Sequence, residues 1–202
     1  MYVFQRHSIP VLIFACGLTA VVTAQARPSK QDATRFQAKL AQITRYAVVP
    51  ASPRRGQSIQ VTDAEVNAYL KYNAARDVPV GIVDPTLSAL GNGRVGGHAI
   101  VDLDAVRMQK KRGWTDPLGY LTGRLPVTAS GVLLTQNGVG RFQLESAAIS
   151  GVTIPKTVLQ ELLSYYSKTS ENPSGINMDD PFQLPARIRE IKVGQGNALI
   201  VQ

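Results

Sequence analysis

The stretch from residue 124 to residue 167 constrains the fold more than any other part of this chain. Asn137-Gly138 lies between two long runs in which apolar and polar residues alternate, the pattern of a β-hairpin closed by a type I′ turn. Registered on this turn, the hairpin has one apolar and one polar face. An apolar face must be covered, and the amphipathic helix expected from residue 155 to 167 is the nearest element that can cover it.

The apolar face of this hairpin has large side chains near the turn and small ones in its middle. Small side chains cannot fill a thick layer by themselves, so either a helix packs very close to them or a groove for an apolar ligand remains. On this register the face consists of Leu125, Val127, Ala129, Gly131 and Leu133 opposite Phe142, Leu144, Ser146 and Ala148.

Residues 1–26 have the pattern of a secretory signal peptide. A weakly basic start at Arg6 precedes an apolar run over residues 9–22, and Ala24-Gln25-Ala26 is a small-residue cleavage site. This pattern predicts an exported protein, periplasmic or secreted. Two alternatives stay open: a lipoprotein signal cut before Cys16, and an uncleaved N-terminal membrane anchor. Removal of the leader would also remove the only cysteine, which leaves no thiol for a disulfide, a metal site or a nucleophile.

The remainder of the chain divides into an N-terminal helix with a linker, residues 27–56, and a single α+β domain, residues 57–202. The linker is rich in proline and arginine. We expect the helix to be peripheral to the domain, with a partner-binding arm as the alternative. Its apolar stripe comprises Phe36, Leu40, Ile43 and Ala47.

The domain begins with a short strand, residues 58–61, followed by a helix over residues 63–76. Thr62 and Glu65 have the spacing of a capping box, in which each side chain binds the backbone N–H of the other residue. The other expected elements are a hairpin of residues 82–90 and 95–106, an irregular connection 107–123, a loop 169–185, and a terminal hairpin of residues 186–193 and 197–201.

No constellation in the sequence predicts a reaction. Gly91 to Gly96 match G-x-G-x-x-G, but a strand follows where a dinucleotide site needs a helix, so we interpret the glycines as a hairpin turn. His98, Asp102 and Asp104 alternate onto one strand face, which is more typical of a solvated face than of a metal site. We therefore expect no enzyme activity, no metal and no cofactor.

The formal charge of +8 favours an anionic partner. Export argues against nucleic acid, so the basic cluster Lys110, Lys111 and Arg112 is a candidate contact for lipid headgroups at an anionic membrane surface, with a solvated surface as the alternative.

Residues 61–70, VTDAEVNAYL, resemble the opening helix of small exported bacterial lipid-binding proteins of the tubular lipid-binding (TULIP-like) kind. The order of hairpins and helices over residues 58–202 is similar as well. The resemblance implies a strongly curved antiparallel sheet around a helix, with an apolar groove for acyl chains. The domain is long enough for at most one half of such a tube. The last hairpin, LPARIREI onward, is also similar to that of uncharacterised exported proteins.

Together these features predict an α+β fold in which a curved antiparallel sheet of about six strands packs on two helices, with a peripheral N-terminal helix. The predicted function is binding, without catalysis, of a lipid or another apolar or amphipathic ligand in the cell envelope. The alternative is a structural or interaction module of the envelope with a filled core. The expected ligand-binding residues are Tyr69, Leu70, Ala129, Gly131, Leu133, Phe142, Leu144, Leu159 and Leu162.

Overall fold

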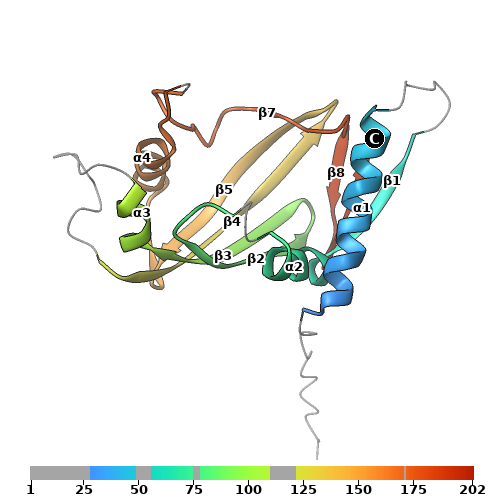
Figure 1. The fold of residues 1–202 in the computed structure, drawn as a ribbon. Helices are drawn as coiled ribbons and strands as arrows, with labels where there is room; N and C mark the ends of the chain where they lie inside the picture. The colour runs from blue at the N-terminus through green and yellow to red at the C-terminus, as the bar shows by residue number, and fades with distance from the viewer. Residues whose placement is uncertain (1–27, 49–55, 75–77, 110–121, 171) are drawn as a thin grey trace, which may run out of the picture.

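The computed structural model describes residues 28–48, 56–74, 78–109, 122–170 and 172–202. Within these ranges, four helices and two antiparallel sheets form a mixed α+β fold, and the large sheet does not close on itself (Figure 1). The predicted fold class is confirmed. The predicted leader, the linker and the Lys110–Arg112 cluster lie outside the described residues. In chain order the elements are α1 (Lys30–Val48), β1 (Ser58–Thr62), α2 (Asp63–Tyr72), β2 (Ile82–Gly91), β3 (Arg94–Asp102), α3 (Leu103–Gln109), β4 (Arg124–Gln136), β5 (Val139–Ile149), β6 (Val152–Thr153), α4 (Lys156–Ser167), β7 (Phe182–Gln183), β8 (Glu190–Val193) and β9 (Asn197–Val201).

The large sheet has six strands in the order β2-β3-β4-β5-β6, with β7 paired to β5, and the small sheet has the order β1-β9-β8. The two main hairpin turns are the predicted ones. Asn92 and Gly93 have φ angles of 53° and 78°, and Asn137 and Gly138 have φ angles of 51° and 81°. Two successive left-handed residues make a type I′ turn, whose twist matches that of the flanking strands.

Two predicted strands are shorter than the sequence pattern indicated. The strand predicted to reach residue 106 ends at Asp102, because the Asp102 carboxylate accepts the backbone N–H of Ala105 at 3.0 Å and starts α3. The strand predicted from residue 186 begins at Glu190, because Ala186 and Arg187 adopt left-handed φ angles of 53° and 56° that no extended strand contains.

The best-buried apolar cluster lies between α1 and the small sheet, at one end of the molecule (Figure 1). It joins Ile43 of α1 to Ile59, Val61 and Ile188, and all four are less than 10% exposed. Helix α1 packs on the small sheet rather than on the large one, and it is firmly docked: Ile43 is only 4% exposed.

Helix α2 connects α1 and both sheets through polar side chains. The capping box is present: the Thr62 hydroxyl accepts the Glu65 N–H, and the Glu65 carboxylate accepts the Thr62 N–H. Lys39 of α1 donates to both Glu65 oxygens at 2.7 Å and to the Gln60 carbonyl of β1, also at 2.7 Å. Burial acts to raise the pKa of Glu65, but the hydrogen bonds from Lys39 and Thr62 outweigh it and hold the pKa below its usual range.

The same helix satisfies the free edge of β2. The Asn67 side chain accepts the Leu87 N–H and donates to the Leu87 carbonyl, both at 2.8 Å. The Asp63 carboxylate accepts the N–H of Ala89 at 3.0 Å. Asp63 and Asn67 are four residues apart, a rise of about 6 Å along the helix, and Leu87 and Ala89 are two residues apart, about 6.6 Å along the strand. The two side chains of α2 are therefore spaced to meet these two residues of the β2 edge.

We predict that Glu65→Gln lowers the free energy of unfolding by about 2 kcal/mol at pH 7, because it leaves a partly buried Lys39 ammonium without its counter-charge. The folded-state pKa of Glu65 is depressed, so this contribution is present above the unfolded pKa and is lost as the pH falls through the folded one. Urea denaturation at pH 7 and at pH 3 measures both effects. The matched control is Glu161→Gln, an exposed residue of α4; an equal loss at both pH values would contradict the prediction.

We predict that Asn67→Leu destabilises the edge of β2, because it removes both partners of the Leu87 backbone at a cost of about 2 kcal/mol. Hydrogen exchange at the Leu87 amide should accelerate in the variant, while amides in the centre of β4 change only as much as global stability does. Lys71→Ala, an exposed change on the same helix, is the control. Unchanged protection at Leu87 would show that the side-chain bonds are dispensable.

Candidate ligand-binding surface

One face of the large sheet is apolar across the three neighbouring strands β3, β4 and β5, and we call it the apolar face. Its members follow from the register of β3 with β4 and of β4 with β5, since alternate residues of a strand point to the same side. They are Val95, Gly97, Ala99 and Val101 of β3, Leu125, Val127, Ala129, Gly131 and Leu133 of β4, and Phe142, Leu144, Ala147 and Ile149 of β5.

A β-bulge corrects the predicted register of the hairpin. Leu133 pairs with Phe142 and Gly131 with Leu144, as expected, but Ser130 pairs with Ser146, so Glu145 has no partner in β4. The placement of Ser146 and Ala148 on the apolar face was therefore wrong. Ser146 lies on the opposite face, where its hydroxyl is 2.8 Å from that of Ser130, and Ala147 and Ile149 replace Ser146 and Ala148.

Aromatic rings, rather than a helix, cover the smallest residues of the hairpin. A Cβ on Gly131 would lie 2.6 Å from the ring of Phe142, and a Cβ on Gly140 would lie 2.6 Å from the ring of Phe182 in β7. Such distances are far below van der Waals contact, so both glycines are required for the rings to lie flat on the sheet. The two rings therefore fill part of the space over the small residues.

The rest of the apolar face remains partly open. Among its members only Gly131 and Ala147 are buried, and the others are half-buried. Helix α4, the predicted cover, contacts β5 but contains no buried residue. It lies with α3 at the end of the hairpin opposite α1 and α2 (Figure 1). Cover by α4 is thus confined to one end of the sheet.

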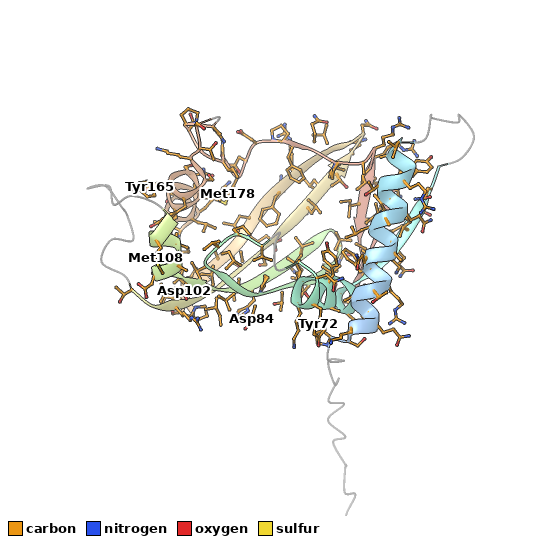
Figure 2. All side chains as sticks on the ribbon, viewed as in Figure 1. Tyr72, Asp84, Asp102, Met108, Tyr165 and Met178 are labelled. Atoms are coloured by element: carbon orange, nitrogen blue, oxygen red, sulfur yellow. The ribbon has the colours of Figure 1, made fainter. Side chains whose placement is uncertain are left out.

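Helix α4 instead binds the segment that follows it. The Gln160 side chain donates to the Ile176 carbonyl at 2.9 Å and accepts the Met178 N–H at 2.8 Å. Ser164 also donates to the Ile176 carbonyl, and Ser167 accepts the Ile176 N–H. Figure 2 shows Tyr165 and Met178 together at this end of the molecule. The polar stripe of α4 thereby fixes residues 175–178 beside the sheet.

A cavity of about 610 Å³ opens between this segment and the apolar face. Two aromatic rings line the cavity: Phe142 of β5 and Phe182 of β7. The volume lies in the range of pockets that hold small organic ligands. The remaining lining residues are Ser164, Asn172, Ser174, Gly175, Ile176, Asn177, Met178, Asp180 and Pro181. Sequence reasoning did not find these residues, because residues 169–185 show no periodic pattern.

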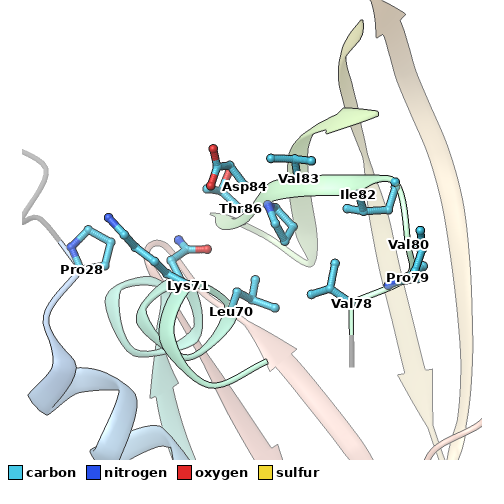
Figure 3. Close-up of a pocket in the computed structure, with 13 residues that line it drawn as sticks. Pro28, Leu70, Lys71, Val78, Pro79, Val80, Ile82, Val83, Asp84 and Thr86 are labelled. Carbon is cyan, nitrogen blue, oxygen red and sulfur yellow. The ribbon is translucent and has the colours of Figure 1, made fainter. Parts of the chain in front are cut away.

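A second cavity, of about 590 Å³, lies between α2 and the chain that enters β2 (Figure 3). Its walls are mainly apolar, with Leu70 and Lys71 from α2 facing residues 78–86. In Figure 3, Asp84 lies at its rim, at a bulge where the φ angle is 47°. This cavity and the first share no residue among those that line them.

The predicted site residues therefore do not all meet in one pocket. Ala129, Gly131, Leu133, Phe142 and Leu144 lie together on the apolar face. Leu159 and Leu162 are half-buried residues of α4, which contacts β5. Tyr69 packs on Phe36 of α1 with ring centroids 5.2 Å apart, and Leu70 lines the second cavity. The headgroup residues Lys110, Lys111 and Arg112 lie outside the described residues.

The acidic residue at the end of β3 already has structural partners. Besides starting α3, Asp102 accepts from Arg124 at 3.0 Å, and these bonds from the Ala105 N–H and Arg124 lower its pKa. His98 is exposed on the opposite, polar face, and Asp104 belongs to α3 rather than to the strand. The structure does not bring three potential metal ligands together anywhere in its described residues.

Comparison with known proteins gives little similarity. No family model matches the chain, and no curated protein matches it. Among solved structures, the crystal structure of a lipopolysaccharide binding protein aligns with a TM-score of 0.22 and 13% identity, over 76% of this chain. The alignment spans 45% of the length of that protein. Within the described ranges, no helix has the length and apolar character needed to cross a membrane.

We predict that Gly140→Ala displaces the ring of Phe182, because the new methyl group would occupy the space of that ring. The expected cost is about 1–2 kcal/mol of unfolding free energy. In the Phe182→Ala background the same glycine substitution should be nearly neutral, because the atoms nearest the new methyl group all belong to the Phe182 ring. Thermal unfolding of the four proteins gives the coupling; additive losses would show that the ring does not lie on Gly140.

Proposed function

We propose that this protein binds a lipid, with its apolar chain lying on the apolar face, and does no chemistry on it. The observation that supports this most directly is the exposure of the face. Ten of its thirteen residues are half-buried side chains larger than glycine, contributed by three neighbouring strands, and described helices cover only its ends. Exposure of such a surface to water is unfavourable. Covering it with a ligand stabilises the complex by about 25 cal/mol for each Å² of apolar surface removed from water.

The floor of this surface has the shape that an extended chain needs. Gly97, Ala129 and Ala147 pair in one row across β3, β4 and β5, and larger residues such as Leu144 and Val127 flank the row. With strands about 4.8 Å apart, the row is a shallow furrow roughly 10 Å long. An acyl chain fits a furrow of this kind better than a rigid, globular group does.

The proposal includes export, which rests on the signal-peptide pattern of residues 1–26. It includes no catalytic step, because the sequence offers no nucleophile, base and orienting group in a recognisable arrangement. The competing proposal is an envelope interaction module that uses the same face to bind another protein.

We predict that Ala129→Phe abolishes lipid binding while the fold is retained, because the new ring fills the furrow. The matched control is Thr128→Phe, which adds a comparable ring to the adjacent, exposed position on the opposite face. Displacement of a fluorescent fatty acid measures affinity, and mass spectrometry of solvent extracts identifies co-purified lipid. Affinity should fall at least about tenfold in Ala129→Phe only. Absence of both fatty-acid binding and co-purified lipid in the unmodified protein would favour the interaction module.

A further inference from the structure

The cavity beside Phe142 is continuous with the apolar face through that residue. Phe142 belongs to the apolar face, where it pairs with Leu133, and it also lines the cavity. A ligand whose chain lies on the apolar face can therefore place its polar end at this cavity, which several polar side chains line.

The walls of this cavity combine fixed aromatic rings with uncharged polar groups. Phe142 and Phe182 are held against Gly131 and Gly140, so their ring positions are set by the backbone. Asn172 and Ser174 line the cavity, and their side chains make no hydrogen bond within the described structure. Amide and hydroxyl groups in this state can each donate to a ligand and accept from it.

One carboxylate completes the lining. Asp180 accepts the amide of Asn177 at 3.0 Å through Oδ1, which orients the carboxylate and leaves Oδ2 to accept from a ligand. Its neighbour Asp179 is paired with Lys156 at 2.5 Å, so that lysine is already neutralised. The described residues that line the cavity include no lysine or arginine.

These features select against two common headgroups. An anionic phosphate would meet the exposed Asp180 carboxylate with no described cation in the lining to compensate, and like charges repel. A phosphocholine carries such a phosphate too, and its quaternary ammonium has no N–H or O–H group to donate to the oxygens of Asn172 and Ser174. A hydroxyl-rich headgroup has both donors and acceptors, and its C–H faces pack on aromatic rings.

We propose that this cavity binds an uncharged, hydroxyl-rich headgroup, a sugar or a glycerol, and that the ligand is a neutral glycolipid or acylglycerol. This inference rests on the proposed function, because it assigns the polar end of the same ligand. Asn172, Ser174 and Asp180 are the specificity-determining residues, and the two phenylalanine rings form the platform on which the headgroup lies.

The test compares four amphiphiles with twelve-carbon chains and different headgroups: dodecyl glucoside, dodecyl phosphate, dodecylphosphocholine and lauric acid. Each is titrated below its micelle concentration against the full-length mature protein carrying a fluorescent fatty acid. We expect dodecyl glucoside to displace the probe at about tenfold lower concentration than dodecyl phosphate or dodecylphosphocholine, as two or three additional hydrogen bonds allow.

Substitutions identify the residues that cause the headgroup preference. Asn172→Ala with Ser174→Ala, and separately Asp180→Asn, should reduce the preference for the glucoside to about threefold or less, while displacement by lauric acid is not weakened. Gln143→Ala, an exposed residue on the polar face of β5, is the matched control and should retain the full preference.

The outcomes separate this inference from the proposed function. Equal displacement by all four amphiphiles, or a preference that survives all the variants, overturns the headgroup assignment and leaves lipid binding intact. A preference for the phosphate or for the phosphocholine overturns it as well. If neither the probe nor any amphiphile binds, the proposed function and this inference fail together.

Discussion

The unpaired edge of β2 is the constraint on which the arrangement of the whole molecule depends. A strand edge leaves N–H and C=O groups that must be satisfied, and here the side chains of α2 and the backbone of Gly194 and Gly196 satisfy them. The same solution recurs where the sheets meet. The Thr135 hydroxyl of β4 accepts from the Ile191 N–H at 2.8 Å and donates to the Ile191 carbonyl at 3.0 Å, and Lys39 binds the Gln60 carbonyl of β1. Side chains thus take the place of additional strands.

This arrangement separates the part of the molecule that stabilises the fold from the apolar face, which stays partly open. The buried apolar cluster around Ile43 and Ile59 lies between α1 and the small sheet. The large sheet, in contrast, is held at its β2 edge by α2 and at the tip of its long hairpin, where Gly138 bonds to Leu184 and Arg189. Because these attachments are polar, as are the bonds between Thr135 and Ile191, the apolar face does not have to be covered for the chain to fold.

The sequence predicted those features that depend on a few neighbouring residues. The type I′ turns at Asn92-Gly93 and Asn137-Gly138 and the capping box at Thr62 follow from local backbone preferences, and all are present. The bulge at Glu145 could not be predicted, because residues 146–148 are all small. A run of small residues does not indicate which of them face the apolar side of the sheet. The start of α3 was missed for a related reason: Leu103 and Ala105 continue the alternation of β3, and only the Asp102 cap ends it.

The residues that carry the TULIP-like resemblance have structural tasks in this fold. Thr62 caps α2, Glu65 holds α1 through Lys39, and Asn67 holds β2. A motif whose residues have such tasks indicates an architecture in which a helix holds the edge of a sheet. It carries no information about a ligand. The residues that would determine the ligand lie in the segment after α4, which the motif does not include. Chains that share the α2 motif but differ between residues 172 and 182 should therefore keep the open apolar face and change the headgroup they accept.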